Sequence, residues 1–276
     1  MTIIGAMADK NDFLEKYGPW ALVAGGSEGL GGAFAEELAG RGLNLFILSR
    51  RPGPLEEIAG RLRAAHGVQV RTLSLDMADP ATLAAVEEAT AGYEIGLLVC
   101  NAGTAYTGPF LRPEFDEYQR ILDVNCRCSL GLIHAHARKM AARGRGGIVV
   151  MSSLAAFQGS PMVAVYGSTK AFLVTLAEAL ADELKPRGVD VCACCPAVVL
   201  TPNFLNDGHA ADGPTPLSLE PAYVARAAIR DLGRKTIVIP SVMSRLAHFM
   251  MGRLIPRQTT VRLLGRSTRA MYREKA

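Results

Sequence analysis

A tyrosine and a lysine stand four residues apart in the segment Tyr166-Gly-Ser-Thr-Lys170. On a helix this spacing brings both side chains to one face, where a lysine ammonium favours the phenolate form of the tyrosine. A tyrosine in that setting can give or take a proton near neutral pH. The hydroxyl of Ser153, which follows an apolar run, can hydrogen-bond the same reacting oxygen. The group predicts acid–base chemistry at a substrate oxygen, although the spacing is a weak signal by itself.

A glycine-rich turn lies between the first apolar run and the first helical pattern. Glycines there let a pyrophosphate approach the backbone N–H groups, and the N-terminus of the following helix favours negative charge. The GxxxGxG spacing therefore predicts a dinucleotide site; the alternative is a tight turn without a ligand. The predicted contacts in this turn are Gly25, Ser27, Glu28, Gly29, Leu30 and Gly31.

The second apolar run ends in Ser49, Arg50 and Arg51. An NAD site commonly has an acidic residue here that accepts hydrogen bonds from the ribose hydroxyls, whereas an NADP site has a small residue and an arginine for the 2′-phosphate. The neutral serine and the two arginines favour NADP(H) over NAD(H), with Arg50 as the stronger contact. The alternative is that both arginines are solvated loop charges.

Short apolar runs alternate with helical patterns along the chain, as expected for strands buried on both faces of a parallel sheet and for the helices that connect them. The expected strands are Ala21–Ala24, Asn44–Leu48, Val68–Leu75, Ile95–Cys100, Gly147–Met151, Val189–Cys195 and Thr236–Ile239. The expected helices are Leu30–Arg41, Pro54–His66, Pro80–Ala91, Glu114–Arg143 and Tyr166–Pro186. This alternation predicts an α/β fold: a Rossmann-type, doubly wound parallel sheet of about seven strands with helices on both faces.

The chain reads as one domain with an extension. We expect residues 1–240 to form the domain, including an N-terminal helix and a substrate loop over 201–220, and residues 241–276 to form a basic helical extension. The loop is rich in Pro, Gly, Asn and Asp and follows the sixth expected strand. Ligands bind at the carboxyl ends of strands in open α/β sheets, so this loop is expected at the binding side.

Composition excludes several classes of protein. Of 276 residues, 49% are hydrophobic and 20% are charged, which is inconsistent with a disordered chain, a coiled coil or a collagen-like fibre. No charge-free apolar run is long enough to span a membrane, and the start lacks a basic leader followed by an apolar core, so we expect a cytoplasmic protein. The 6 cysteines lack the paired spacing of zinc sites and are interpreted as small buried hydrophobes; no metal is expected.

Charge is unevenly distributed. Residues 1–233 hold 20 Lys and Arg against 25 Asp and Glu, whereas residues 234–276 hold 10 against 1. Met243, Leu246, Phe249, Met250 and Leu254 recur at helical spacing in the basic extension. The extension is interpreted either as a flap over the substrate pocket or an oligomer contact, or as a helix on an anionic membrane. A nucleic acid is not among the expected partners.

The ordered set of motifs resembles the short-chain dehydrogenase/reductase family, from about Gly18 to Ile239. The resemblance is carried by the glycine turn, Asp76, Asn101-Ala102-Gly103, Asn125, Ser153, Tyr166-xxx-Lys170 and Pro196 through Thr201. It implies a catalytic tetrad of Asn125, Ser153, Tyr166 and Lys170, in which Tyr166 exchanges the proton, Ser153 holds the substrate oxygen, and Lys170 bonds the nicotinamide ribose. Asn125 would support Lys170 through a water.

The resemblance also implies further cofactor contacts. Asp76 would hydrogen-bond the adenine with Met77 beside it, and Thr201 would meet the carboxamide. The remaining implied contacts are Asn101, Ala102, Gly103, Pro196 and Val199. A homodimer or homotetramer through the helices near 114–143 and 166–186 is implied as well.

Two residues depart from the family pattern: Ala24 stands where Thr is usual, and Ala197 stands where Gly is usual. The first change is expected to weaken cofactor binding and the second to crowd the nicotinamide or substrate side. An NADPH-dependent enzyme that interconverts a ketone and a secondary alcohol is the favoured interpretation. The alternatives are a non-catalytic NADP(H)-binding regulator and a membrane-surface scaffold of the same fold.

The expected substrate side is apolar, which suits a bulky hydrophobic ketone or alcohol such as a steroid, a ketoacyl chain or an aromatic ketone. The residues that line it by this interpretation are Leu154, Ala155, Phe157, Met162, Val163, Tyr106, Phe110, Val198, Val199, Phe204 and Leu205. Each aromatic residue is equally compatible with ordinary core. His209 is interpreted as a solvated loop histidine.

Overall fold

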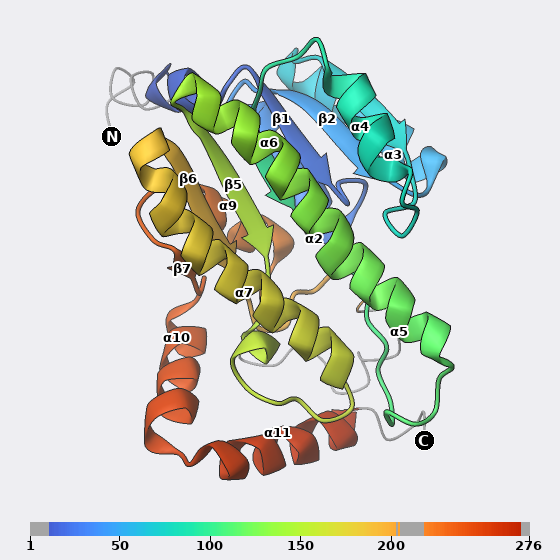
Figure 1. Cartoon of the computed structure of the whole chain (residues 1–276), viewed down its shortest axis with the longest axis vertical. Helices are drawn as coiled ribbons and strands as arrows, with labels where there is room; N and C mark the ends of the chain where they lie inside the picture. Colours follow the sequence, from blue (N-terminus) through green and yellow to red (C-terminus); the bar gives the residue numbers. More distant parts are fainter. Residues whose placement is uncertain (1–10, 203, 205–217, 272–276) are drawn as a thin grey trace.

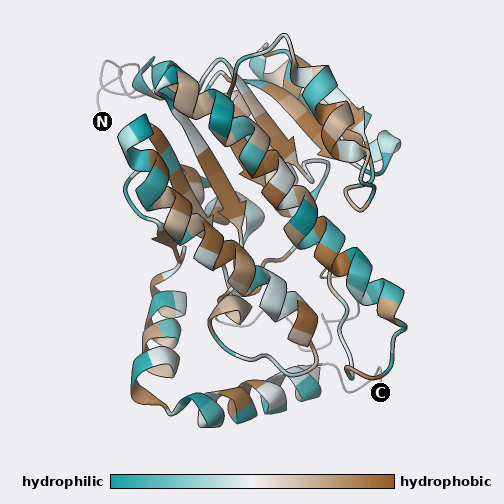
Figure 2. Cartoon of the chain, in the orientation of Figure 1, coloured by the Kyte–Doolittle hydropathy of each residue, from teal (hydrophilic) through white to brown (hydrophobic). Residues whose placement is uncertain are grey.

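A computed structural model describes residues 11–202, 204 and 218–271. Seven parallel strands form one sheet in the order β3-β2-β1-β4-β5-β6-β7. Their bounds are β1 Trp20–Ala24, β2 Asn44–Ser49, β3 Val70–Ser74, β4 Ile95–Cys100, β5 Gly146–Met151, β6 Val189–Cys194 and β7 Ile237–Val238. The predicted doubly wound parallel sheet is confirmed, and Figure 2 shows its strands as apolar segments between helices that alternate apolar and polar residues.

Helices cover both faces of the sheet (Figure 1). On one face lie residues 11–17, α2, α3 and α9, and on the other lie α4, α6 and α7, each group with its own buried apolar cluster. The bounds are α2 Gly29–Gly40, α3 Pro52–His66, α4 Thr82–Thr90, α5 Phe115–Leu122, α6 Ser129–Arg143, α7 Ala164–Leu184, α9 Pro221–Asp231, α10 Val242–Phe249 and α11 Arg257–Met271. Shorter turns are η1 Asp123–Cys128, η2 Leu154–Phe157, η3 Lys185–Arg187 and η5 Met250–Leu254.

Strand alternation divides side chains between the two cores. In β1, Ala21 and Val23 enter the core under α2, while Leu22 and Ala24 enter the core under α6 and α7. Because both faces are covered, the strand has no polar side, which is why the parallel strands appear in the sequence as continuous apolar runs.

The cysteines follow the same alternation. Cys192 and Cys194 lie in one core and Cys195 in the other, as the alternation of side chains along a strand requires. Burial raises the pKa of the Cys195 thiol to about 12, so this group is neutral and acts as an apolar side chain.

The strand order reverses direction between β1 and β4, which pair in parallel although β2 and β3 intervene in sequence. The segments that follow β1 and β4 therefore diverge to opposite faces of the sheet and leave a crevice at its carboxyl edge. The glycine turn follows β1, and Asn101 follows β4. The fold thus positions both predicted cofactor segments at one crevice.

The long helix expected over 114–143 differs from the prediction. It consists of α5, the π-helical turn η1 and α6 in succession, so one turn is wider than in an α-helix. Asn125 lies in this turn with its side chain fully buried. Single π-helical turns are frequently found where a helix contributes to a functional site.

The chain continues past β7 into a C-terminal arm, made of α10, η5 and α11. The arm descends from the sheet and then crosses below the ends of α7 and η2 (Figure 1). Pro256 stands at its elbow, and the Thr260 hydroxyl donates to the Met251 carbonyl across it at 3.3 Å. Within the described residues, no helix is both long and apolar enough to cross a membrane.

Candidate active site

The glycine turn is held against its neighbours by backbone contacts. The N–H groups of Gly25 and Gly26 both donate to the Leu48 carbonyl, at 2.8 and 3.1 Å. The Asn101 side-chain amide donates to the Gly25 carbonyl at 2.8 Å and joins the turns after β1 and β4. Ala24 is buried in the core, so backbone bonds tie this turn without the hydroxyl that is usual at that position.

Glycine is required sterically at two positions in the turn. Gly25 has φ +80°, and a Cβ there would lie 2.8 Å from the Cα of Ala102. A Cβ on Gly31 would lie 1.8 Å from the Gly25 carbonyl oxygen. Both are closer than atoms in van der Waals contact, so the turn and the start of α2 lie backbone against backbone. This leaves the N-terminus of α2 open to an anionic group.

A cleft of about 360 Å³ lies at the crevice between β1 and β4. It brings together the predicted residues Gly25, Ser27, Glu28, Gly29, Leu30, Ser49, Arg50, Arg51, Asp76, Met77, Asn101, Ala102, Gly103 and Thr201. Five predicted cofactor residues are not among its lining residues: Gly31, Tyr166, Lys170, Pro196 and Val199. Pro196 is buried, and Val199 forms a bridge with Leu219. The cleft combines a helix N-terminus, a glycine cradle and basic side chains, which together fit a dinucleotide.

The end of β2 supplies small and basic groups to this cleft. The hydroxyls of Ser27 and Ser49 lie 2.7 Å apart. Arg51 pairs with Glu28 at the rim. Arg50 makes no ion pair with any residue that the structure describes, so its guanidinium is available to a ligand phosphate.

Asp76 is fixed by a partner that local sequence did not indicate. Its carboxylate accepts from the Ala78 N–H at 3.0 Å and from the Arg120 guanidinium at 3.1 and 3.0 Å. These two donors hold the pKa of Asp76 below its usual range. Arg120 also lines the cleft from α5. It lies 44 residues from Asp76 in the sequence. Its position in the helical pattern is that of an ordinary solvated arginine, so the sequence gives no sign of this pairing.

Asn125 connects two segments at the inner end of the cleft. Its Oδ1 accepts from the Thr104 N–H at 2.8 Å, and its Nδ2 donates to the Thr104 carbonyl and to the Thr169 hydroxyl, each at 2.9 Å. The loop after β4 is therefore tied to α7. Thr104 and Thr169 are site residues that sequence reasoning did not identify; the position of Thr169 beside Lys170 was the available signal.

Lys170 lies one helical turn below Tyr166 on α7, with Nζ 5.6 Å from the centre of the tyrosine ring. The ammonium donates to the Met151 carbonyl at 2.8 Å. A Cβ placed on Gly103 would lie 3.3 Å from this Nζ and 3.5 Å from Asn125 Oδ1. The lysine, the asparagine and the inner end of the cleft thus meet at Gly103, where a larger side chain would be in tight contact with the ammonium.

Burial lowers the pKa of Lys170 to about 8, since the side chain is only 4% exposed. Ser153 caps the short helix η2, where its hydroxyl accepts from the Ala155 N–H at 3.2 Å. Its neighbour Ser152 points the other way, and its hydroxyl donates to the Lys170 carbonyl at 2.8 Å. This division between the two serines follows from the alternation of side chains along the strand that they extend.

Two loops join beside the catalytic set. The Gly108 N–H donates to the Met162 carbonyl at 2.8 Å, and Met162 has φ 71°, which is uncommon for a residue with a side chain. Phe110 stacks on Tyr118 with ring centres 5.1 Å apart, and the Tyr118 hydroxyl donates to the Phe110 carbonyl. Backbone held in such a conformation is concentrated at functional sites.

The predicted substrate loop over 201–220 is described only in part. Phe204 donates its N–H to the Thr201 hydroxyl at 3.3 Å. Thr201 and Pro202, at the start of the loop, line the cleft. Leu205 and His209 lie outside the described residues.

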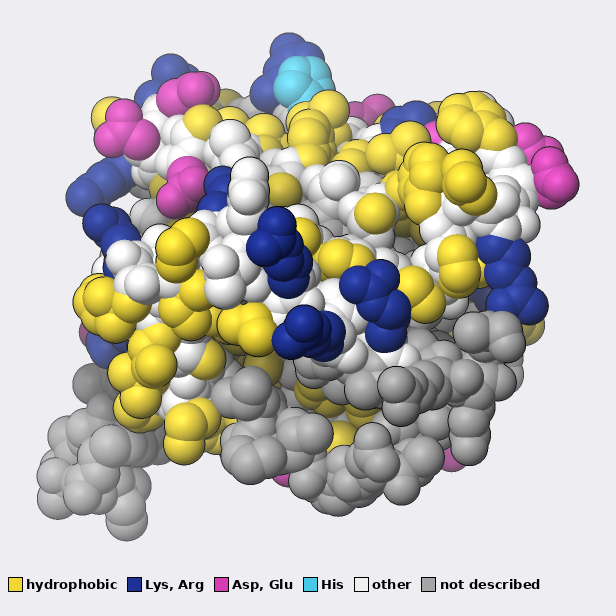
Figure 3. Space-filling model, turned by 90° about the horizontal axis from the view of Figure 1, so that it is seen from below, with side chains coloured by type: hydrophobic (Ala, Val, Ile, Leu, Met, Phe, Trp, Pro, Cys, Tyr) yellow, Lys and Arg dark blue, Asp and Glu magenta, His cyan; other side chains and the backbone are white. Residues whose placement is uncertain are grey.

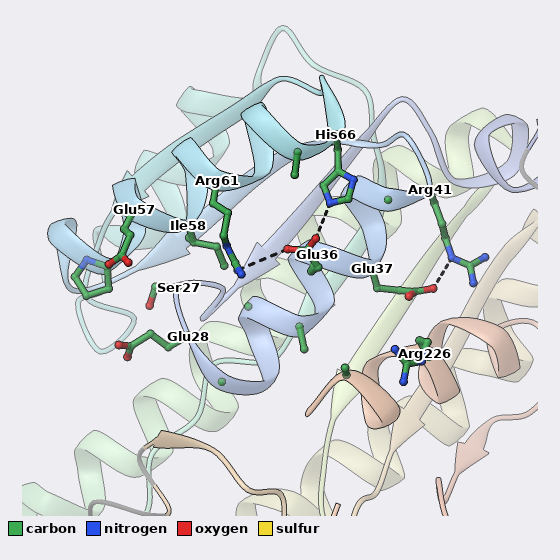
Figure 4. Close-up of a pocket in the computed structure, with 17 residues that line it drawn as sticks. Ser27, Glu28, Glu36, Glu37, Arg41, Glu57, Ile58, Arg61, His66 and Arg226 are labelled. Carbon is green, nitrogen blue, oxygen red and sulfur yellow. Dashed lines mark hydrogen bonds and ion pairs between the residues drawn. The ribbon is translucent and has the colours of Figure 1, made fainter. Parts of the chain in front are cut away.

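A larger hollow of about 1050 Å³ lies on the other side of the glycine turn, between α2, α3 and α9 (Figure 4). Its charged side chains are largely paired with one another. The Glu36 carboxylate lies 2.6 Å from His66 Nε2 and 3.6 Å from Arg61 Nη2. Its lining includes no residue of the loop after β4, whereas Gly103 and Thr104 of that loop line the first cleft and contact Lys170 and Asn125. Its size therefore does not make it the reaction site.

Three comparisons agree on the ancestry of the chain. The sequence model of the short chain dehydrogenases matches residues 19–211. A 7β-hydroxysteroid dehydrogenase of Collinsella aerofaciens is 31% identical over 228 residues, which cover 82% of this chain and 87% of that protein.

Two solved structures are similar over most of their length. One, from a study of 7β-hydroxysteroid dehydrogenase stereoselectivity, has a TM-score of 0.87 at 28% identity and covers 91% of this chain and 98% of its own. The other is a short-chain dehydrogenase from Sphingobium yanoikuyae in complex with NADPH, with a TM-score of 0.76 at 32% identity, covering 86% and 94%. With the cleft, the glycine turn and the sheet order, these matches mean that the chain belongs to the short-chain dehydrogenase/reductase family of oxidoreductases.

Proposed function

We propose that this protein is an NADPH-dependent reductase of a bulky hydrophobic ketone, or the alcohol dehydrogenase that runs the same reaction in reverse. The observation that carries the proposal is the position of Lys170 Nζ between Tyr166 and the inner end of the dinucleotide cleft. A buried ammonium at that point can act on both the tyrosine and a bound ribose.

When bound, the nicotinamide supplies or accepts the hydride. The chain's own part is to hold the carbonyl and to move a proton. Tyr166 donates its phenolic proton to the substrate oxygen during reduction and recovers it during oxidation. Ser153 donates a hydrogen bond to the same oxygen. Lys170 stabilises the phenolate by its charge, and Asn125 fixes the loop that borders the cleft.

Support for NADPH comes from the end of β2. Ser49 brings a hydroxyl and no carboxylate, so nothing at this position repels a 2′-phosphate. Arg50 makes no ion pair with a described residue, and it can form charge-assisted bonds with that phosphate. The relative solved with NADPH makes this cofactor reasonable for a chain of the same fold.

Support for a bulky apolar substrate comes from the loops beside Tyr166. Leu154, Ala155 and Phe157 in η2 are half-buried, and Met162 and Val163 precede α7 in the same state. Few polar groups accompany them, as in pockets for hydrophobic ligands. The relative named for its action on a hydroxysteroid is consistent with a substrate of this class.

We further propose a homodimer or homotetramer built on α6 and α7. An apolar groove of about 490 Å³ runs between these helices, lined by Leu130, Ile133, Ala137, Ala141, Leu176, Leu180 and Leu184 among others. Such a groove on the outside of a domain is typical of an interaction surface. A cytoplasmic location remains a proposal of the sequence.

The test is NADPH oxidation across a panel of keto-steroids, β-ketoacyl thioesters, aromatic ketones and small ketones, with wild type and Tyr166→Phe. We expect one ketone class to be reduced, and Tyr166→Phe to lose turnover by roughly 10²–10⁴-fold while it still binds NADPH. Tyr93→Phe is the matched control, because Tyr93 contacts Trp20 and Phe46 away from the cleft.

If no ketone of the panel causes NADPH oxidation although NADPH still binds, a non-catalytic cofactor-binding protein would be favoured. Equal losses in Tyr93→Phe and Tyr166→Phe would remove the specific role assigned to Tyr166.

A further inference from the structure

The first helix of the C-terminal arm turns an apolar stripe toward solvent. Val242, Leu246 and Phe249 are 70%, 53% and 55% exposed. Met243 and Met250 are exposed beside them, so the five side chains occupy positions i, i+1, i+4, i+7 and i+8 of one helical face. A helix of a soluble domain commonly turns such a stripe inward.

The opposite face of α10 carries small and polar groups and contacts the protein. Ser244 is fully buried, and its N–H donates to the Ser241 hydroxyl at 3.0 Å. The His248 ring lies 4.2 Å from the Phe157 ring in η2. The face with Ser244 and His248 thus packs against the domain, and the apolar stripe faces away from it.

The second helix of the arm rests on the loop that follows Ser153. A Cβ on Gly159 would lie 3.5 Å from a methyl of Val261, and one on Gly265 would lie 2.9 Å from Pro161. Thr260 is fully buried against the elbow. These contacts fix the orientation of α11, and Arg262, Leu263, Arg266 and Arg269 are exposed on its other faces.

The exposed part of the arm is strongly basic. Residues 241–271 contain six arginines and no Asp or Glu: Arg245, Arg253, Arg257, Arg262, Arg266 and Arg269. All six are exposed, and none forms an ion pair with a described carboxylate. Figure 3 views this end of the molecule, where Lys and Arg side chains lie among apolar ones near the middle of the face and the visible acidic side chains lie toward its edge.

We propose that the α10–η5–α11 arm binds the surface of an anionic phospholipid bilayer. The stripe on α10 would enter the boundary between headgroups and acyl chains, and the arginines would meet lipid phosphates. A second copy of the chain fits this surface less well, because a two-fold contact would place the same acid-free basic segment against itself. The loop after Ser153 underlies the arm, so bound enzyme would hold its substrate side against the membrane, where hydrophobic ketones partition.

The test is co-sedimentation of the full-length protein with phosphatidylcholine vesicles, with and without phosphatidylglycerol. We expect the protein to pellet with the anionic vesicles, to remain largely in solution with the neutral ones, and to be released in part by high salt. Arg253→Gln with Arg257→Gln should weaken partitioning about fivefold for each arginine removed. Leu246→Ser with Phe249→Ser should weaken it by at least tenfold.

Lys139→Gln with Lys185→Gln is the charge-matched control, because both side chains are exposed and lie neither on the arm nor in the lining of the α6–α7 groove. This variant should pellet like wild type. Equal pelleting with neutral and anionic vesicles would overturn the proposal, and so would unchanged pelleting of the arginine variant. A smaller oligomer in either arm variant, measured without vesicles by sedimentation, would instead identify the stripe as a contact between copies. The assay needs neither cofactor nor substrate, so its result is independent of the reductase proposal.

Discussion

The side chain of Asn125 brackets the backbone of Thr104, accepting from its N–H at 2.8 Å and donating to its carbonyl at 2.9 Å. The same amide reaches the Thr169 hydroxyl on α7. One buried residue in a π-helical turn therefore holds together the loop after β4 and the helix that carries Tyr166.

Replacing Asn125 should damage both stability and turnover. Asn125→Ala leaves the Thr104 N–H and carbonyl without their partner in a partly buried position, which is expected to lower the free energy of unfolding by about 1 kcal/mol or more. We expect kcat to fall by at least tenfold because the loop at Gly103 loses its anchor beside Lys170. Urea unfolding and steady-state kinetics measure the two effects.

The matched control for this substitution is Asn44→Ala, since Asn44 Oδ1 accepts a single exposed bond from the Gln69 N–H. A fall in kcat of the same size in Asn44→Ala would mean that general destabilisation, rather than the loop anchor, accounts for the loss.

Cofactor choice should depend on Ser49 and Arg50. Ser49→Asp places a carboxylate where the 2′-phosphate is expected, so kcat/KM with NADPH should fall by roughly 10–100-fold while that with NADH rises. Arg50→Gln should lower kcat/KM with NADPH and leave kcat/KM with NADH nearly unchanged. Arg71→Gln is the control, because Arg71 stacks on the Tyr93 ring outside the cleft. Unchanged preference in Ser49→Asp would contradict the NADPH assignment.

The pH dependence of kcat/KM should follow the protonation of Lys170. Burial lowers its pKa to about 8, so the ammonium is present below that pH and is lost as the pH rises through it. If the charge supports Tyr166, kcat/KM of the free enzyme for reduction falls above pH 8, approaching tenfold per pH unit. A pH–rate profile measures this with the ketone that gives the largest Tyr166-dependent rate.

Lys170→Arg provides the internal check, because a guanidinium stays protonated across this range. Its absolute rate should be lower, but the decline near pH 8 should disappear. Persistence of the same decline in Lys170→Arg would assign it to another group.

Acid stability should depend on His136. This residue of α6 is 1% exposed, and neither ring nitrogen has a hydrogen-bond partner among the described residues. Burial, with Lys139 and Arg143 adding to it, lowers the pKa of His136 to about 4. The unfolded chain binds the proton at the ordinary value near 6.5, so stability is lost as the pH falls from there to 4, by about 3 kcal/mol in all.

His136→Leu should reduce this loss, since no proton is then taken up on unfolding at that position. Urea unfolding of both proteins between pH 7 and pH 4 gives the two slopes. His134→Gln, exposed on the same helix, should retain the wild-type slope. If His136→Leu loses stability as steeply as wild type, the acid sensitivity lies elsewhere.

Much of the fold and part of the site were predictable because their causes are local. Continuous apolar runs indicate strands covered on both sides, and all seven were predicted within a few residues of their bounds. The glycine turn and the residues at the end of β2 were predicted at the cleft, since strand ends of a parallel sheet meet at one edge. The helix α9 and the π-helical turn were not predicted. The helix follows a long irregular loop, and a single π-helical turn leaves no recognisable spacing of apolar residues in the sequence.

The sequence by itself determined the types of groups available: a tyrosine and lysine on one helical face, an apolar stripe and six arginines in the arm. Only the tertiary structure decided their partners. The pairing of Arg120 with Asp76 joins residues 44 positions apart, and the outward direction of the stripe on α10 depends on which face docks on Phe157. Spacing fixes which side chains share a face, but the contacts that bury or expose that face come from segments distant in the chain.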